Sequence, residues 1–146
     1  MSATDYRPEG VTTVTAYLAV SDGAAAIAFY KRAFDAEERF RMARDDGFVE
    51  HATLRIGDST LYLSNEPPHG PARSPSALGG TGVTLYVYVP DCDAVWARAL
   101  EAGATVVTPL DDQAWGDRYG LLCDPFGHLW AIATMKDSEA AGSSSQ

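Results

Sequence analysis

The chain contains an internal repeat that limits the folds it can adopt. Residues 14–22 (VTAYLAVSD) recur 69 positions later as residues 83–91 (VTLYVYVPD), and five of the nine positions are identical. A repeat of this length is too long for a solenoid unit and too short for a complete domain. We therefore predict two copies of one module that share a core, with a ligand cleft between them.

Composition narrows the class of protein. The chain has 146 residues, 46% hydrophobic and 21% charged, which predicts one globular domain. The net charge of −9 argues against nucleic acid or an anionic membrane as partner and permits a neutral or cationic ligand, although acidity also aids solubility. No apolar segment is long enough to span a membrane, and the polar first ten residues do not resemble a signal peptide. With only Cys92 and Cys123 no disulfide framework is implied, so we expect a cytoplasmic protein.

Hydrophobic periodicity predicts an α+β fold in which both modules have the order βαβββ. Ser21 or Asp22 can cap the first helix, and Asp91 can cap the second. In the first module the elements are expected at residues 11–20, 23–35, 38–44, 48–56 and 60–64. In the second module they are expected at residues 83–89, 92–102, 105–110, 112–123 and 128–134. The single domain then spans residues 11–135. It consists of modules 11–66 and 80–135 with a proline-rich linker between them, and the flexible tails are 1–10 and 136–146.

Strand alternation predicts one sheet face against the helices and a second face of different chemistry. Val14, Leu18, Val83 and Val87 have the parity of the helix-facing side. The far face is rich in hydroxyls and aromatic rings: Thr15, Tyr17, His51, Thr53, Arg55, Thr60, Tyr62, Ser64, Thr84, Tyr86 and Tyr88. Such a face suits a ligand cavity, but a solvated face or a dimer contact has the same pattern.

Several motifs resemble the vicinal oxygen chelate (VOC) superfamily, the glyoxalase / bleomycin resistance protein / dioxygenase group. They are residues 17–22 (YLAVSD), 28–34 (AFYKRAF) and 124–130 (DPFGHLW), together with the duplicated βαβββ order. Residues 115–120 (WGDRYG), and His51-Ala52 leading into 55–59 (RIGDS), resemble the PhnB-like branch. The resemblance implies two modules whose mixed sheets curl into a cup around a small molecule. It also implies a homodimer, sometimes with modules exchanged between chains.

The resemblance raises the question of a metal. Metal-dependent members place His or Glu on the first and fourth strands of each module. The corresponding positions here are Thr15, Tyr62, Thr84 and Ala131. These supply no imidazole or carboxylate, so we predict no metal and no other cofactor, and metal-dependent glyoxalase or dioxygenase activity is disfavoured. The remaining candidates, which include His51 and Asp117, show no ligand spacing such as HxxxH.

Three residues are considered for roles other than metal binding. His51 is the best candidate for a general base, although a lone strand histidine is commonly structural. Trp115, beside Gly116, could stack on a planar ligand. Arg118 could bind a carboxylate or phosphate, or form a salt bridge to Asp111, Asp112 or Asp117.

The sequence supports three functional hypotheses. The first is a metal-independent small-molecule-binding protein, for example one that sequesters a cationic aromatic antibiotic of the bleomycin type. Its site residues would be Thr15, Tyr17, His51, Tyr62, Thr84, Tyr86, Trp115 and Arg118. The second is an enzyme, a lyase, isomerase or oxygenase-like activity that uses His51 or a tyrosine pair as acid and base. The third is an interaction module whose polar face is only a dimer surface.

Overall fold

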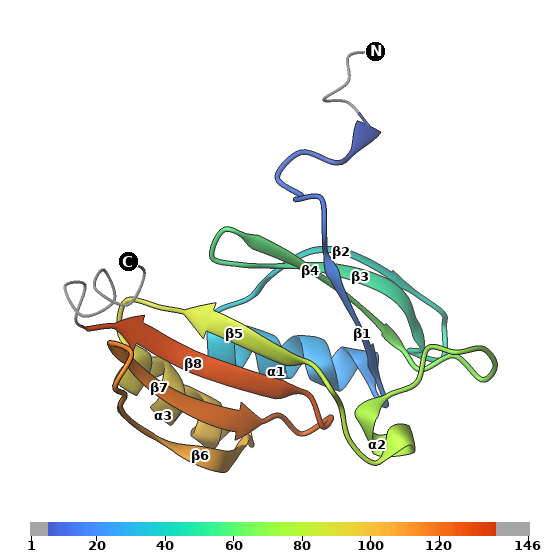
Figure 1. Cartoon of the computed structure of the whole chain (residues 1–146). Helices are drawn as coiled ribbons and strands as arrows, with labels where there is room; N and C mark the ends of the chain where they lie inside the picture. Colours follow the sequence, from blue (N-terminus) through green and yellow to red (C-terminus); the bar gives the residue numbers. More distant parts are fainter. Residues whose placement is uncertain (1–5, 137–146) are drawn as a thin grey trace.

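The computed structural model describes residues 6–136, which form two four-stranded mixed sheets and three helices (Figure 1). The first module contains β1 (Ala16–Val20), α1 (Gly23–Phe34), β2 (Glu37–Ala43), β3 (Val49–Ile56) and β4 (Ser59–Asn65). The second contains β5 (Thr84–Tyr88), α3 (Cys92–Ala102), β6 (Thr105–Asp112), β7 (Asp117–Cys123) and β8 (Leu129–Met135). The one-turn helix α2 (Pro75–Leu78) lies between them. Both modules have the predicted order, so the α+β class is confirmed.

The two sheets have the same topology. Sheet A has the order β1-β4-β3-β2 and sheet B the order β5-β8-β7-β6, with one parallel pair in each, β1 with β4 and β5 with β8. The helix in each module crosses from the first strand back over one face of the sheet. Within residues 6–136 no strand of sheet A pairs with a strand of sheet B, so the first strand of each module lies at an edge of its sheet and is paired on one side only.

Side-chain caps begin both long helices where the sequence predicts. The Asp22 carboxylate accepts a hydrogen bond from the backbone N–H of Ala25 at 3.1 Å, and Asp91 accepts one from Ala94 at 3.2 Å. Asp22 rather than Ser21 is therefore the cap of α1. Each bond satisfies one of the backbone donors that the first helical turn leaves free.

The expected placement of the residues just before the first strand of each module is wrong. The first strand begins at Ala16 rather than at residue 11, and Val14 and Val83 precede their strands with side chains 83% and 63% exposed, so neither faces a helix. The proline-rich segment between the modules contains the short helix α2, which Ser74 caps and in which Pro75 occupies the first position, where its missing N–H costs nothing.

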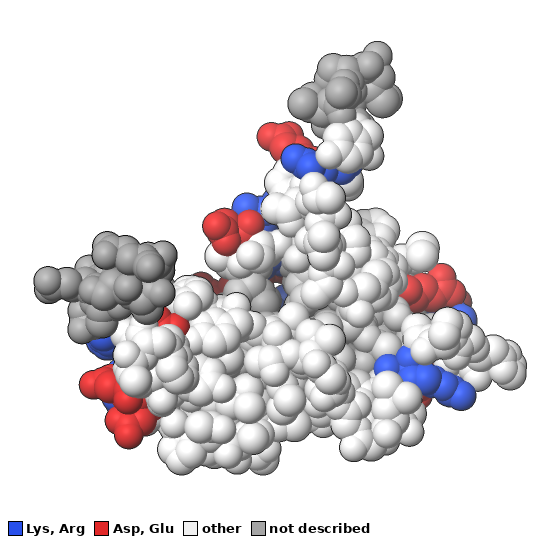
Figure 2. All heavy atoms as spheres, in the orientation of Figure 1, with Lys and Arg blue, Asp and Glu red and all other residues white. Residues whose placement is uncertain are grey.

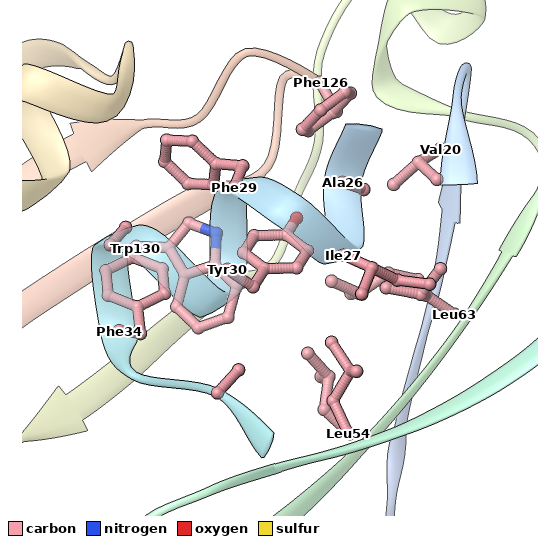
Figure 3. Close-up of a cluster of buried hydrophobic side chains, with 14 of the residues drawn as sticks. Val20, Ala26, Ile27, Phe29, Tyr30, Phe34, Leu54, Leu63, Phe126 and Trp130 are labelled. Carbon is pink, nitrogen blue, oxygen red and sulfur yellow. The ribbon is translucent and has the colours of Figure 1, made fainter. Parts of the chain in front are cut away.

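The core lies where the two modules meet. Figure 3 shows α1 side chains between Leu54 and Leu63 of sheet A and Trp130 of sheet B. The rings of Phe34 and Trp130 lie 4.5 Å apart, centroid to centroid, and those of Tyr30 and Trp130 lie 5.2 Å apart. Trp130 is buried.

A buried carboxylate ties the modules together at this point. Asp124, in the turn before β8, accepts hydrogen bonds from Tyr30 Oη at 2.5 Å and Trp130 Nε1 at 2.9 Å. It also accepts from the backbone N–H groups of Phe126 and His128, each at 2.9 Å. Burial and the nearby Asp124 raise the pKa of Tyr30 well above its ordinary value, so its phenol remains a donor.

This joint fixes how the sheets are oriented. Helix α1 contacts α3 as well as its own sheet, and both sheets turn their helix-covered faces toward the shared core. The opposite face of sheet A, here called outer face A, and the opposite face of sheet B, outer face B, therefore both point away from the core. In Figure 1, outer face B is turned toward the viewer.

Candidate functional site

Outer face A carries a cluster built around His51. The cross-strand register places Tyr17 of β1 opposite Tyr62 of β4, and Tyr62 opposite Thr53 of β3. Tyr17 Oη and His51 Nδ1 are hydrogen-bonded at 2.9 Å, and His51 Nε2 and Thr53 Oγ1 at 3.2 Å. The Tyr62 ring packs edge-on against His51, with centroids 4.9 Å apart. Strand alternation therefore correctly placed these four side chains on one face.

The His51 cluster is ordered and yet open. Both ring nitrogens of His51 have partners, which fixes the orientation of the imidazole. Tyr17 is 53% exposed even though its hydroxyl is hydrogen-bonded. The cluster thus presents aromatic surface and hydrogen-bonding groups to whatever covers outer face A.

Outer face B carries a second cluster, built around a carboxylate. Asp117, at the start of β7, is only 4% exposed. Its Oδ2 accepts hydrogen bonds from Tyr86 Oη at 2.6 Å, Tyr88 Oη at 2.9 Å and Trp115 Nε1 at 3.2 Å. Tyr119 stacks on Tyr86 with centroids 5.6 Å apart and meets Trp115 edge-on at the same separation. We call these five residues the Asp117 cluster.

The Asp117 cluster keeps its tyrosines protonated. Desolvation, and then the hydrogen bond to Asp117, raise the pKa of Tyr86 strongly. The hydrogen bond to Asp117 is the main cause of a raised pKa at Tyr88. Both phenols therefore remain neutral donors, and the cluster carries the one negative charge of its carboxylate.

From the sequence, Asp117 is considered only as a metal ligand or as a partner of Arg118, and it is not identified as an acceptor for tyrosine hydroxyls. A usable signal was present. Asp117 has the strand parity of Tyr119, and the tryptophan lies two positions before it. A buried acid of the same parity as neighbouring tyrosines is a natural acceptor for their hydroxyls.

The other predicted site residues lie apart from these clusters. Arg118 is on the helix-facing side of β7, where its guanidinium pairs with Asp93 of α3 at 3.0 Å and with Asp112 at 3.2 Å. Thr15 precedes β1, and Thr84 is the exposed first residue of β5. Of the predicted set, the structure brings Tyr17, His51 and Tyr62 together on one face and Tyr86 and Trp115 on the other.

The two clusters do not meet within one chain. No hydrogen bond or aromatic contact among residues 6–136 joins the His51 cluster to the Asp117 cluster, because each lies on a different outer face. A groove of about 790 Å³ does run between the modules. It is mainly apolar, with Leu61, Leu85, Val87 and Trp130 among its lining residues, and it follows the free edge of β5.

The register also bears on the metal positions. Tyr62 lies opposite Tyr17 and Ala131 lies opposite Tyr86. Whether Tyr17 and Tyr86 or their neighbours Thr15 and Thr84 are taken, the donor set lacks imidazole and carboxylate, and Ala131 is fully buried. The residues therefore do not fit the family's divalent metal. Within the part of the chain that the structure describes, no group of three or more His, Cys, Asp or Glu residues is arranged to hold a metal ion.

These features define a two-module α+β protein with an aromatic, hydrogen-bonding face on each sheet. The family model of the Glyoxalase/Bleomycin resistance protein/Dioxygenase superfamily matches residues 11–132. The chain belongs to this superfamily.

Similar proteins are known in bacteria and plants. An uncharacterised protein of Mycobacterium bovis is 48% identical over 137 residues, which cover 88% of this chain and 90% of the relative. Among solved structures, TioX from Micromonospora sp. ML1 is 30% identical, with a TM-score of 0.66, over 84% of this chain and 95% of TioX. An Arabidopsis thaliana gene product is 29% identical, with a TM-score of 0.68, over 84% of this chain and 98% of its own.

A PhnB protein from Bacillus cereus shares the fold. It is 22% identical, with a TM-score of 0.66, over 84% of this chain and 99% of its own. The predicted likeness to PhnB-like proteins is therefore confirmed at the level of structure. Across residues 6–136, none of the helices is both long and apolar enough to cross a bilayer.

Proposed function

We propose that the protein binds a small organic molecule between outer face A of one chain and outer face B of a second copy, without the family's metal. The observation that carries this proposal is that both outer faces expose aromatic side chains whose polar atoms are already held in place. Trp115 is 47% exposed and Tyr17 is 53% exposed, although both make hydrogen bonds. Rings that are fixed before a ligand arrives lose little conformational entropy when they bind it.

The free sheet edges support a homodimer. β1 and β5 are edge strands that pair on one side only, and a free strand edge readily accepts another chain. Val14 and Val83, just before these strands, expose large apolar surface. A second copy that covers these edges would bury this surface and bring an outer face A opposite an outer face B.

We further propose that the protein acts in the cytoplasm and that its ligand is a cationic aromatic compound. The name of the superfamily includes bleomycin resistance. The net charge of −9 attracts cations, and the exposed aromatic rings can stack on an aromatic ligand. Sequestration of such a compound requires tight binding without chemical turnover.

Mixed dimers test the shared site directly. Tyr62→Leu removes a ring from outer face A, and Trp115→Leu removes one from outer face B. Each variant alone should bind bleomycin or a panel of smaller aromatic compounds weakly in isothermal titration calorimetry. Co-expression of the two makes about half of the dimers mixed, and each mixed dimer has one intact site, so about a quarter of the wild-type capacity should return. No recovery would mean that the site does not combine the two chains, and a monomer in sedimentation would exclude the dimer.

A second candidate function is proton transfer on outer face A. It rests on the Tyr17–His51–Thr53 hydrogen-bond chain, which links an exposed phenol to an imidazole. A histidine so placed can act as general acid or base toward a bound substrate. If His51→Gln binds ligands normally and no substrate is turned over by the wild-type protein, the binding role alone stands.

A further inference from the structure

The Asp117 carboxylate is a nearly buried charge whose partners are neutral. Its three hydrogen-bond donors are two phenols and an indole, and all three bonds fall on Oδ2. Within residues 6–136 it forms no ion pair, because the neighbouring Arg118 is turned to the other side of the strand and engaged by Asp93 and Asp112. A buried anion without a counter-ion is costly, and a cation brought from outside offsets that cost.

The side chains that hydrogen-bond to this carboxylate, and Tyr119 that packs on them, are aromatic and uncharged. The rings of Tyr86 and Tyr88 lie 5.1 Å apart, and Trp115 and Tyr119 complete the cluster. Figure 2 shows lysine, arginine, aspartate and glutamate gathered at the rim of this view, whereas the surface over β5, β8 and β7 is almost free of charge. Aromatic ring faces are negative, so they attract cations in the same sense as the carboxylate beneath them.

The hydrogen bonds also restrict what kind of cation fits. Oδ2 already accepts three donors, so a ligand gains from the charge and the ring faces more than from a directed N–H···O bond to that oxygen. An ammonium group with alkyl substituents needs no such bond and places its apolar methyl groups against the rings. A bare primary ammonium has three N–H donors and a guanidinium has five, which is more than the second carboxylate oxygen, Oδ1, can accept.

We propose that the Asp117 cluster recognises an alkylated ammonium group, tertiary or quaternary, carried on an aromatic or apolar body. This proposal rests on the proposed function, since it names the ligand class for the outer face B half of that site. Tyr86, Tyr88 and Trp115 supply the ring surface, and Asp117 supplies the charge. Because the phenols and the indole are tethered to Oδ2, the surface is formed before the ligand binds.

The test compares benzyltrimethylammonium with benzyl alcohol and with benzylsulfonate on the intact protein, by isothermal titration calorimetry. We expect saturable binding of the cation and at least tenfold weaker binding of the neutral and anionic compounds. Benzylammonium should bind no more tightly than its trimethylated analogue. Raising the salt concentration should weaken binding of the cation, because part of the attraction is electrostatic.

Variants assign the binding to this cluster. Asp117→Asn keeps the shape of the side chain and removes its charge, so the dissociation constant for benzyltrimethylammonium should rise at least tenfold. Asp45→Asn, in the exposed turn between β2 and β3, makes the same change in net charge and should have no effect. Because Asp117 is buried and its replacement also changes three hydrogen bonds, Trp115→Leu provides a second test at an exposed position. It should weaken binding severalfold with an unchanged thermal midpoint.

The outcomes separate this inference from the function on which it rests. Equal binding of the cation and benzyl alcohol would overturn the cation proposal while leaving small-molecule binding intact. Equal weakening by Asp45→Asn and Asp117→Asn would show general attraction to an acidic protein and would likewise overturn it. No binding of any of the probes, bleomycin included, would count against the proposed function itself.

Discussion

The hydrogen bond from Tyr30 to Asp124 should be a main support of the joint between the modules. Tyr30→Phe removes only the hydroxyl and keeps the ring that packs on Phe34 and Trp130. Asp124 then retains three of its four donors, Trp130 Nε1 and two backbone N–H groups. A buried hydrogen bond to a charged acceptor contributes about 1.5–3 kcal/mol, so we expect the free energy of unfolding to fall by about that amount.

Urea denaturation followed by tryptophan fluorescence measures this change. The midpoint should fall without a change in the m-value, because the surface exposed on unfolding stays the same. Tyr6→Phe is the matched control. Tyr6 is exposed, and its hydroxyl accepts a hydrogen bond from the adjacent Arg7. A loss below about 0.5 kcal/mol in Tyr30→Phe, comparable with an ordinary surface substitution, would refute the reasoning.

Three further predictions concern pH, packing and metal. Tyr30 stays protonated in the folded protein, whereas an unfolded tyrosine ionises near pH 10, so above about that pH the unfolded chain binds fewer protons and stability falls as pH rises. Tyr30→Phe should flatten this alkaline decline in urea titrations at stepped pH. Gly120→Ala should cost about 1–3 kcal/mol in the same assay, because a Cβ there would lie 2.5 Å from a ring carbon of Trp96. Gly82→Ala should leave the free energy of unfolding unchanged, because a Cβ there would meet no atom within 4 Å. Elemental analysis after dialysis without chelator should find no stoichiometric divalent metal, and EDTA should leave the thermal midpoint unchanged; a stoichiometric metal would overturn the donor-set argument.

Much of the fold follows from local pattern. The helix that Asp22 begins and the sheet face shared by Tyr17, His51 and Tyr62 depend on capping and on side-chain alternation, which act over a few residues. The start of β1 at Ala16 could not be predicted in the same way. Residues 13–15 continue the alternation, but no strand pairs with them, and pairing is a property of the tertiary structure.

The candidate site depended on information that the pattern does not contain. Alternation shows which face a side chain occupies but not where that face points. The contact of α1 with α3, and the bond between Tyr30 and Asp124, turn the two outer faces away from one another. Asp117 was missed for a related reason, since its donors Tyr86 and Tyr88 are about thirty positions away along the chain and on a strand that does not adjoin β7.

The tyrosine repeated in both modules takes part in two different clusters. Tyr17 and Tyr86 hold the same place in the repeat, and each reaches across the fourth strand of its module to a residue on the third. Tyr17 meets the imidazole of His51, whereas Tyr86 meets the carboxylate of Asp117. The residue opposite the tyrosine on the fourth strand also differs. It is Tyr62 in the first module and the buried Ala131 in the second. One outer face therefore offers a hydrogen-bonding ring system and the other an anionic one. If the two faces meet across a dimer, the ligand they select is itself asymmetric, with a polar end toward His51 and a cationic end toward Asp117.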